Sequence, residues 1–486
     1  MMWETKGAIS IQSKIGLFGA VSTGVGMIIA TSCFIPLASG ASSVGVTFIP
    51  AILLVCAINM LAAASIAELG ALMPNLTGGL AQYTLVGLGP FVTIVTMIGG
   101  YFVSNIFAAP AEGAMFANVM TAFLGDTLPT AFYSVTLTIA LIFINLRGVK
   151  VSTLVQSVIA AVMVTSLFAL GFLGAAGLGT GEETAQPLVL STDLDDILPL
   201  TTTAFWLFIG SEFIIPLGKD MKAPKRDIPR AMFLSLAIMC VIQSLMVAGF
   251  AHYTPWDELA ASDAPHILYA ANMLGDVGRV WIIIVAILAA VSTQNSIIGC
   301  VAEICCGMAK IGLLPALFQR KNRHGAPYVV ILLLGILTIL IEATGLSSGD
   351  AIQFLILAAS LFWMISYIVS HINVMVLRHS APQVPRTYRV PGYPVLQLFA
   401  IVGTLYMIWH ISPDPSERLE IFAITGVSTL LLAIYAYVWV RKRLHISIFH
   451  RVPLSKVMAM EDPLYYLCRH PQHVPTPPDA APRAEA

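Results

Sequence analysis

Twelve apolar runs dominate this chain, and they restrict its fold to a bundle of membrane-spanning helices. A segment inside a bilayer must satisfy its own backbone hydrogen bonds, and about 20 helical residues cross the hydrocarbon core. Of 486 residues, 57% are hydrophobic and only 10% are charged, which leaves no soluble domain of any size. We therefore expect an all-α polytopic membrane protein with twelve transmembrane helices. The runs cover residues 15–38, 45–66, 91–119, 130–146, 151–177, 198–217, 231–252, 279–308, 328–343, 350–377, 395–411 and 420–440.

Charged residues separate into two sets of alternating connections. Acidic residues gather after spans 5 and 7, at 182–196 and 257–276. Lys and Arg follow spans 4, 6, 8, 10 and 12, for example at Arg147, Lys222, Arg320, Arg378 and Arg441. Because Lys and Arg are retained on the cytoplasmic side, we expect both termini in the cytoplasm and the chain in the plasma (inner) membrane. Binding of lipid headgroups or partners by the basic loops is the alternative.

Spans 1 and 6 are interrupted near their middles. Span 1 contains Gly24, Gly26 and Pro36, and span 6 contains the sequence Ile209-Gly210-Ser211 followed by Glu212. Such residues are unfavourable in a continuous helix, and an intramembrane carboxylate is costly unless it serves a function.

The two interruptions occupy corresponding positions, five spans apart. Because five is odd, the second unit enters the membrane with the opposite orientation. Paired interrupted spans in two inverted halves indicate the binding site of a transporter. Close helix packing by small residues is an alternative for either span alone, but it does not explain the matching positions.

Five stretches carry a family resemblance. They are ELGALMP at 68–74 with Gly78, Gly79 and Tyr83; NLRGVK at 145–150; GSE at 210–212 with KAPKRDIP at 222–229; GLLP at 312–315 with AP at 326–327; and RTYRVPG at 386–392. In this order and spacing they resemble the motifs of the amino acid–polyamine–organocation (APC) transporter superfamily. The resemblance extends from span 1 to span 12.

The resemblance implies a LeuT-type fold, with two inverted five-helix repeats plus two helices. The expected boundaries are a cytoplasmic N-terminus at 1–14, a first repeat at 15–177, an outer loop at 178–197 and a second repeat at 198–377. Spans 11 and 12 with their flanking loops take 378–443, and a cytoplasmic tail takes 444–486. The tail is rich in Pro and Ala from about residue 471 and is expected to be disordered there.

The resemblance also implies secondary active transport of amino acids or related amines by alternating access. A substrate carboxylate would meet backbone N–H groups at one helix break, and an ammonium would meet carbonyls at the other. Trp206 would stack on the substrate; an interfacial or lipid-facing Trp is the alternative. The other substrate-binding positions carried over are Ile29, Ala30, Thr31, Ser32 and Cys33 in span 1, and Phe208, Ile209, Gly210 and Ser211 in span 6.

Span 1 departs from the family pattern, because Ala30 and Ser32 replace two glycines. A Cβ at each position narrows the approach to the backbone. The carboxylate could then be held differently, the substrate could be small, or it could lack an α-carboxylate. The hydroxyls of Thr31 and Ser32 could compensate by donating hydrogen bonds.

The coupling ion is left open between sodium, a proton and none. Several relatives carry a lysine in span 5 where this chain has Met163, so the position lacks a fixed cation. Ser292 and Thr293 in span 8 offer hydroxyl oxygens for sodium, with ordinary polar packing as the alternative. Glu112 and Glu212 are candidate proton carriers; Glu112 could also meet a substrate ammonium or pair with a polar neighbour.

Other functional classes are less well supported by the sequence. An exchanger of cationic amines or polyamines is the main alternative, and a transport-like amino acid sensor is another. We expect no enzyme: GLSSG at 345–349 matches a nucleophile elbow, but in a predicted outer loop. The expected partners are a small-molecule substrate and the lipid bilayer, with no nucleic acid, cofactor or metal site and with the oligomeric state open.

Overall fold

The computed structural model describes residues 15–73, 80–125, 127–148, 153–184, 186, 190–191, 193–346, 348–384, 386–451 and 454. These residues are mainly helical, and within these ranges the only β feature is an isolated bridge between Ile15 and Met221. Some of the predicted features lie outside the described residues. They are the N-terminus 1–14, Pro74, Gly78 and Gly79 of the first motif, Lys150 of the second, Ser347 of the elbow-like sequence, and the tail from 471.

The first five predicted spans are present as helices. Span 1 consists of α1 (Leu17–Ile28), η1 (Thr31–Cys33) and α2 (Phe34–Val44), and η2 (Gly45–Thr47) leads into span 2, which is α3 (Phe48–Leu72). The short α4 (Leu80–Leu88) precedes span 3, made of α5 (Pro90–Met97), the π-helix η3 (Ile98–Val103) and α6 (Ser104–Leu124). Spans 4 and 5 are α7 (Thr130–Leu146) and α8 (Thr153–Ala175).

Span 6 is the most fragmented of the twelve. It comprises α9 (Leu194–Ile197), η4 (Leu198–Leu200), α10 (Thr201–Phe205), η5 (Trp206–Phe208) and η6 (Ser211–Asp220). The remaining spans are α11 (Pro224–Tyr253), α13 (Pro265–Lys310), α14 (Tyr328–Glu342), α15 (Gly349–Ser380), α16 (Val395–Trp409) and α17 (Pro415–Lys442), with α12 (Trp256–Ala261) and η7 (Ala316–Gln319) in connections.

The helices are long and apolar enough to form a multi-pass membrane protein. Within the described residues, eight helical stretches satisfy the length and hydropathy of a membrane span, and four shorter apolar helices accompany them. α13 consists of two helical segments, because Gly275 with φ of 62° interrupts it. The segment after Gly275 corresponds to predicted span 8 at 279–308, and the segment 265–274 precedes it.

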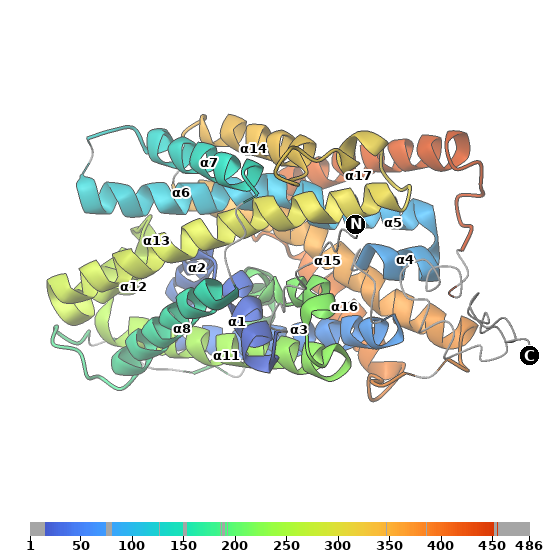
Figure 1. Ribbon diagram of the computed structural model, residues 1–486. Helices are drawn as coiled ribbons and strands as arrows, with labels where there is room; N and C mark the ends of the chain where they lie inside the picture. The colour runs from blue at the N-terminus through green and yellow to red at the C-terminus, as the bar shows by residue number, and fades with distance from the viewer. Residues whose placement is uncertain are drawn as a thin grey trace, which may run out of the picture.

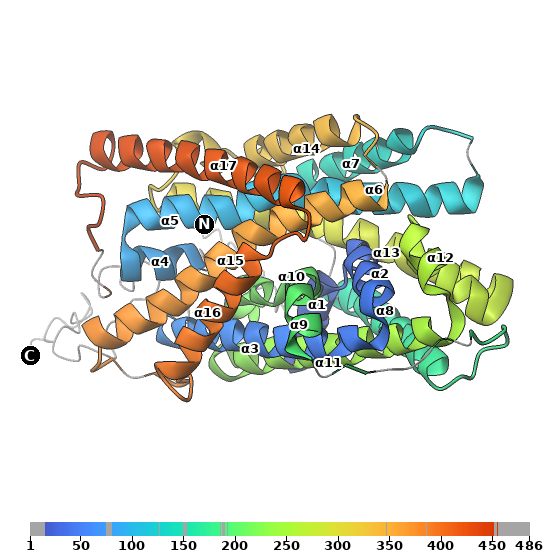
Figure 2. The same ribbon diagram turned by 180° about the vertical axis from the view of Figure 1, so that it is seen from behind.

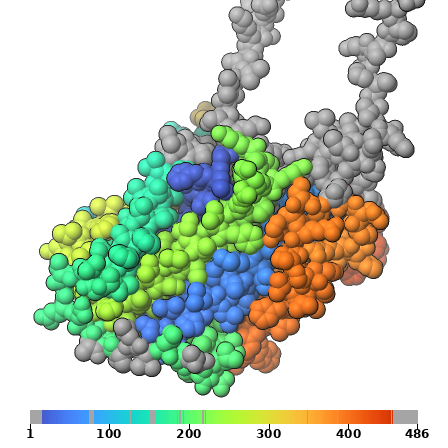
Figure 3. Space-filling model, turned by 90° about the horizontal axis from the view of Figure 1, so that it is seen from below, coloured from blue at the N-terminus to red at the C-terminus, as the bar shows by residue number. Residues whose placement is uncertain are grey.

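The helices form two layers that pack face to face (Figures 1 and 2). In one layer α6 contacts α7, α13 and α14, and in the other α11 contacts α1, α3 and α8. Figure 3 shows α3, α8 and α11 side by side on one face of the molecule. The third and eighth spans thus lie in one layer, and the first and seventh in the other.

The contacts follow the pairing that an inverted repeat requires. Span 1 contacts span 7 through α1 and α11, and its counterpart span 6 contacts span 2 through α10 and α3. Likewise α8 contacts α1 and α11, whereas its counterpart α15 contacts α10 and α3. This two-fold correspondence is the arrangement expected for two inverted five-helix units plus α16 and α17.

Glycines allow α8 and α11 to approach closely. A Cβ on Gly174 would lie 2.9 Å from the Cα of Gly249, so neither position accepts a side chain. Small residues at such crossings permit dense packing, which is the main source of helix association in a bilayer.

Two of the predicted motifs meet at one buried carboxylate, an arrangement we call the Glu68 clamp. Glu68, at the end of α3, accepts hydrogen bonds from Arg378 Nε at 2.8 Å and from the backbone N–H of Val390 at 2.8 Å. Arg386 Nε lies 3.3 Å from the same carboxylate. The clamp therefore ties α3, α15 and the 386–390 segment together.

Candidate functional site

The predicted break in span 1 is present between α1 and η1. Ile29 has ψ of 88° and Ala30 has φ of −104° with ψ of 141°, so the helix stops at Ile28 and restarts at Thr31. Ile29 N–H still donates to the Val25 carbonyl at 2.8 Å, and Ala30 N–H to Ile28 at 2.9 Å. The start of the second half-helix leaves the N–H groups of Thr31 and Ser32 without backbone acceptors.

A carboxylate of the protein itself caps the N-terminus of the half-helix that begins at Thr31. Thr31 N–H donates to Glu112 Oε2 at 3.0 Å, and Ser32 N–H donates to Glu112 Oε1 at 3.1 Å. Glu112 lies on α6 and is fully buried. Free N–H groups and the helix dipole both favour an anion at this position. Of the alternatives for Glu112, the structure has the pairing with polar neighbours, and those neighbours are the expected substrate-binding backbone groups.

The hydroxyls of the turn have other partners. Thr31 Oγ1 donates to the Ala286 carbonyl of α13 at 3.1 Å, and its expected role toward a substrate carboxylate stays a prediction. Ser32 Oγ accepts from Trp206 Nε1 at 2.9 Å. Trp206 is buried and joins the two interrupted spans, which excludes the interfacial or lipid-facing alternative.

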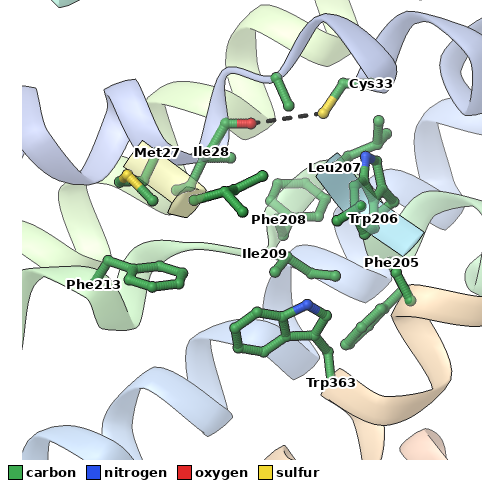
Figure 4. Packing of buried hydrophobic residues seen from close by; sticks show 14 of the residues in the cluster. Met27, Ile28, Cys33, Phe205, Trp206, Leu207, Phe208, Ile209, Phe213 and Trp363 are labelled. Atoms are coloured by element: carbon green, nitrogen blue, oxygen red, sulfur yellow. Dashed lines mark hydrogen bonds between the residues drawn. The ribbon is translucent and has the colours of Figure 1, made fainter. Parts of the chain in front are cut away.

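The break in span 6 lies directly against the break in span 1. Ile209 is extended with ψ of 139°, and Gly210 has φ of 121°, a conformation that residues with a side chain rarely adopt. A Cβ on Gly210 would lie 3.0 Å from the Met27 carbonyl oxygen. Figure 4 shows Met27, Ile28 and Cys33 of span 1 beside Phe208 and Ile209 of span 6. Backbone approaches backbone here, which only glycine permits.

Glu212 follows this break and sits among aromatic side chains. Its Oε2 accepts a hydrogen bond from Tyr367 Oη at 2.9 Å, whereas its buried Oε1 has no hydrogen-bond partner among the described residues. The next residue, Phe213, belongs to an aromatic cluster in which the Tyr101 ring centroid lies 5.2 Å from that of Trp363 and 5.9 Å from that of Phe213. Trp363 lies below Ile209 in Figure 4.

The predicted sodium ligands differ in their surroundings. Thr293 is buried and its hydroxyl donates to the Ile29 carbonyl at 3.1 Å, so two oxygens lie together where span 8 meets the break in span 1. Ser292 is half-buried. Met163 is completely buried in the apolar core. In the described part of the chain, no group of three or more His, Cys, Asp or Glu residues could hold a metal ion.

The structure thus brings most of the predicted site residues together. The turn at 29–33, the segment 206–211, Glu112 and Thr293 share direct contacts, and Glu212 lies at the far side of the span 6 break. Whether any of them binds a substrate stays a prediction.

Sequence reasoning missed three features of the buried interior. Tyr367 of α15 donates to Glu212, and Trp363 lies one helical turn earlier with its ring near that of Tyr367. Their spacing of four residues along one helix face was a signal that the two side chains share a face of α15. Glu342 of α14, at the predicted end of span 9, is buried and accepts hydrogen bonds from Thr138 at 2.8 Å and Gln294 at 3.1 Å.

Comparison with known proteins agrees with this geometry. Residues 10–440 match a protein family described as amino acid permease, which is most of the chain. The chain belongs to the amino acid permease family. The permease is 22% identical over 447 residues to the branched-chain amino acid permease BcaP of Bacillus subtilis (strain 168), covering 87% of this chain and 93% of that protein. It is 25% identical over 337 residues to the polyamine transporter PUT1 of Oryza sativa subsp. japonica, covering 67% and 60% of the two chains.

A solved structure with the same fold is that of a mutant form of the manganese transporter of Eremococcus coleocola. The TM-score is 0.55 at 13% identity, over 88% of the permease and 94% of the other chain. This likeness shows that the two proteins share a fold, independently of the sequence motifs of the permease.

Proposed function

We propose that the permease is a secondary active transporter that moves an amino acid or a closely related amine across the plasma membrane by alternating access. One observation carries the proposal above the rest. The breaks of spans 1 and 6 pack against each other at matching positions. Gly210 packs against the backbone carbonyl of Met27, and Trp206 Nε1 donates a hydrogen bond to the Ser32 hydroxyl. The relatives named as transporters of branched-chain amino acids and polyamines support the same substrate range.

The location of these breaks suits a moving site. Spans 1 and 6 pack with α3 and α11, whereas Glu112 and Thr293 reach the site from α6 and α13 of the other layer. A solute bound between the breaks would therefore touch both layers. Rocking of one layer against the other would expose it first to one side of the membrane and then to the other.

The direction of insertion follows from the loop charges. Lys and Arg after the even-numbered spans support a topology in which those loops and both termini lie in the cytoplasm. Under this topology the Glu68 clamp, with Arg378 and Arg386, lies at the cytoplasmic end of α3 and α15.

The coupling ion is proposed to be a proton carried by Glu112 or Glu212. Both carboxylates are buried beside the helix breaks. Sodium is the second candidate, favoured by the Thr293 hydroxyl and the Ile29 carbonyl, which already lie 3.1 Å apart. Exchange without an ion is the third, and it would suit cationic amines.

Uptake into proteoliposomes tests the proposal. Purified permease is reconstituted, and radiolabelled amino acids and amines are offered with an imposed proton gradient, an imposed sodium gradient or preloaded counter-substrate. We expect accumulation driven by the proton gradient and abolished by a protonophore. Accumulation driven by the sodium gradient alone would indicate that a sodium ion at Ser292 and Thr293 is the coupling ion. Absence of uptake of every candidate by folded protein would contradict the proposed function.

A further inference from the structure

We propose that the permease recognises cationic amines that lack an α-carboxylate, because Glu112 occupies the position where such a carboxylate would bind. This inference rests on the proposed transport function and specifies its substrate class. It is carried by three independent observations: the backbone donors at the break of span 1, the free acceptor at Glu212 and the charge of the spans around the site.

The first observation is that the turn of span 1 has no free donor. A substrate carboxylate needs backbone N–H groups at the start of a half-helix. Every N–H from Ile29 to Phe34 already has an acceptor in the protein. Ile29 donates to Val25, Ala30 to Ile28, Thr31 and Ser32 to Glu112, Cys33 to Ala30, and Phe34 to Thr31 and Ser32.

The side-chain donors beside this turn are also engaged, and the Ser32 hydroxyl itself is hydrogen-bonded to the Glu112 carboxylate. The Thr31 hydroxyl donates to Ala286, and the Trp206 indole N–H donates to Ser32. A carboxylate-bearing substrate would have to displace Glu112, which would leave two carboxylates at one buried turn. Such like charges in a low-dielectric interior oppose each other strongly.

The second observation is an acceptor without a donor. Glu212 is 1% exposed, and its Oε1 receives no hydrogen bond from the described residues. The Tyr101 and Trp363 rings form an aromatic cluster with Phe213, the residue that follows Glu212 in the chain. A carboxylate oxygen next to aromatic rings is a binding site for an ammonium or guanidinium group, through charge-assisted hydrogen bonding and cation–π attraction.

The third observation is the sign of the charge in the spans that build the site. Spans 1, 3, 5 and 6, at 15–38, 91–119, 151–177 and 198–217, contain Glu112 and Glu212 but no Lys, Arg or His. Spans 8 and 10 also reach the site, and they add Arg279 and Glu303 at 279–308 and Asp350 and His371 at 350–377. Arg279 donates to the Ala122 carbonyl and His371 pairs with Ser65, so both basic side chains have partners away from the two breaks. A zwitterionic amino acid would add a third carboxylate to this environment. An amine without a carboxylate adds only positive charge, which the two glutamates balance.

Matched pairs that differ only in the α-carboxylate test this inference. The probes are ornithine with putrescine, arginine with agmatine, and leucine with isoamylamine. Binding to the purified full-length permease is measured by isothermal titration calorimetry, and uptake is measured in proteoliposomes. In the unaltered permease we expect the Kd of the decarboxylated member of at least one pair to be lower than that of its amino acid by a factor of about ten or more.

Removal of the Glu112 carboxylate, which caps the turn of span 1, should change the ratio of the Kd values of the amino acid and its amine. Glu112→Ala frees the N–H groups of Thr31 and Ser32, so the amino acid should gain affinity relative to its amine. Glu112→Gln keeps the shape of the side chain but leaves only one carbonyl oxygen for two donors, and it serves if the Ala variant does not fold. The matched control is Glu303→Gln, because Glu303 pairs with Lys321 at 3.4 Å at an exposed position and should leave the ratio unchanged.

The outcomes separate this inference from the proposed function. A preference for amines that falls in either Glu112 variant supports the inference. The inference is overturned, while the proposed function stands, if the unaltered permease binds and transports the amino acid as well as or better than its amine. It is also overturned if both Glu112 variants keep the ratio of Kd values measured for the unaltered permease. Amines that bind but are not transported would contradict the proposed function and leave the inference in place, and folded protein that binds no probe would overturn both.

Discussion

At the break of span 1, two side chains from other spans supply hydrogen-bond partners that the backbone lacks. Glu112 accepts from the N–H groups of Thr31 and Ser32, and Trp206 donates its indole N–H to the Ser32 hydroxyl. Because each contact joins span 1 to a different span, the turn is held from both sides. The geometry of the candidate site therefore depends on a few buried hydrogen bonds, each with a net contribution of about 1 kcal/mol.

The Trp206–Ser32 contact gives a prediction at this scale. Trp206→Phe retains an aromatic ring but removes the indole N–H, and Ser32→Ala removes the acceptor. Each change should raise the KM for uptake about two- to tenfold, since one buried hydrogen bond contributes about 0.5–1.5 kcal/mol. The double variant should lose no more than either single one, because both remove the same bond.

The control for this prediction is Trp409→Phe in α16, where the side chain is 67% exposed. It should leave the KM unchanged. Additive losses in the double variant would show that Trp206 and Ser32 act separately and would contradict the contact.

Individual residues were predictable from the sequence, whereas their partners were not. Glu112, Glu212 and Trp206 stand out because charge and indole are rare in such apolar spans. The pairing of Glu112 with backbone N–H groups required the fold, since α6 and η1 are 81 residues apart at this contact. Tyr367 was missed although it shares a face of α15 with Trp363, because the spacing does not tell whether that face points toward lipid or toward Glu212.

At the scale of the helices, the break at Gly210 can be tested by a single substitution. Gly210→Ala places a Cβ at φ of 121° and 3.0 Å from the Met27 carbonyl oxygen. Strain of this kind costs about 1–3 kcal/mol, so we expect a lower melting temperature in detergent and loss of most uptake. The control is Gly426→Ala in α17, where a Cβ would have nothing within 4 Å. Equal behaviour of the two variants would contradict the close approach of the breaks.

The Glu68 clamp gives a second prediction at this scale. Glu68→Gln leaves the Arg378 and Arg386 guanidinium groups without their shared carboxylate, and the Arg386 side chain is only 2% exposed. Removing one partner of a buried ion pair costs about 3–5 kcal/mol, so the melting temperature should fall clearly. Glu303→Gln removes the exposed pair with Lys321 and should cost about 0–1 kcal/mol. A stable Glu68→Gln variant would show that the clamp contributes little to holding α3 and α15 together.

The sequence predicted the helices better than their ends. All twelve spans are present, since their apolar lengths leave few alternatives. The predicted start of span 8 at 279 lies close to Gly275, where α13 is interrupted. The separate helical segment at 265–274 was missed, because it carries polar residues such as His266 and Asn272. The start of α9 at Leu194 fell within the predicted outer loop, and the π-helical stretch Ile98–Val103 has no sequence signal that hydropathy detects.

For the whole molecule, the inverted arrangement explains why the two breaks meet. Span 1 and span 6 occupy equivalent positions in the two halves, and α1 and α10 make equivalent contacts with α11 and α3. The candidate site therefore lies between the two layers, near the pseudo-two-fold axis that relates the two halves. That position allows one bound solute to face either side of the membrane while its contacts change little.

The most direct measurement is an experimental structure of the full-length permease with a transported solute bound. We predict density for the solute between the turn at 29–33 and the segment 206–211, with its cationic group toward Glu212. Density at another place in the molecule, with both breaks unchanged and without contact to the solute, would contradict the central claim that transport proceeds through the two interrupted spans.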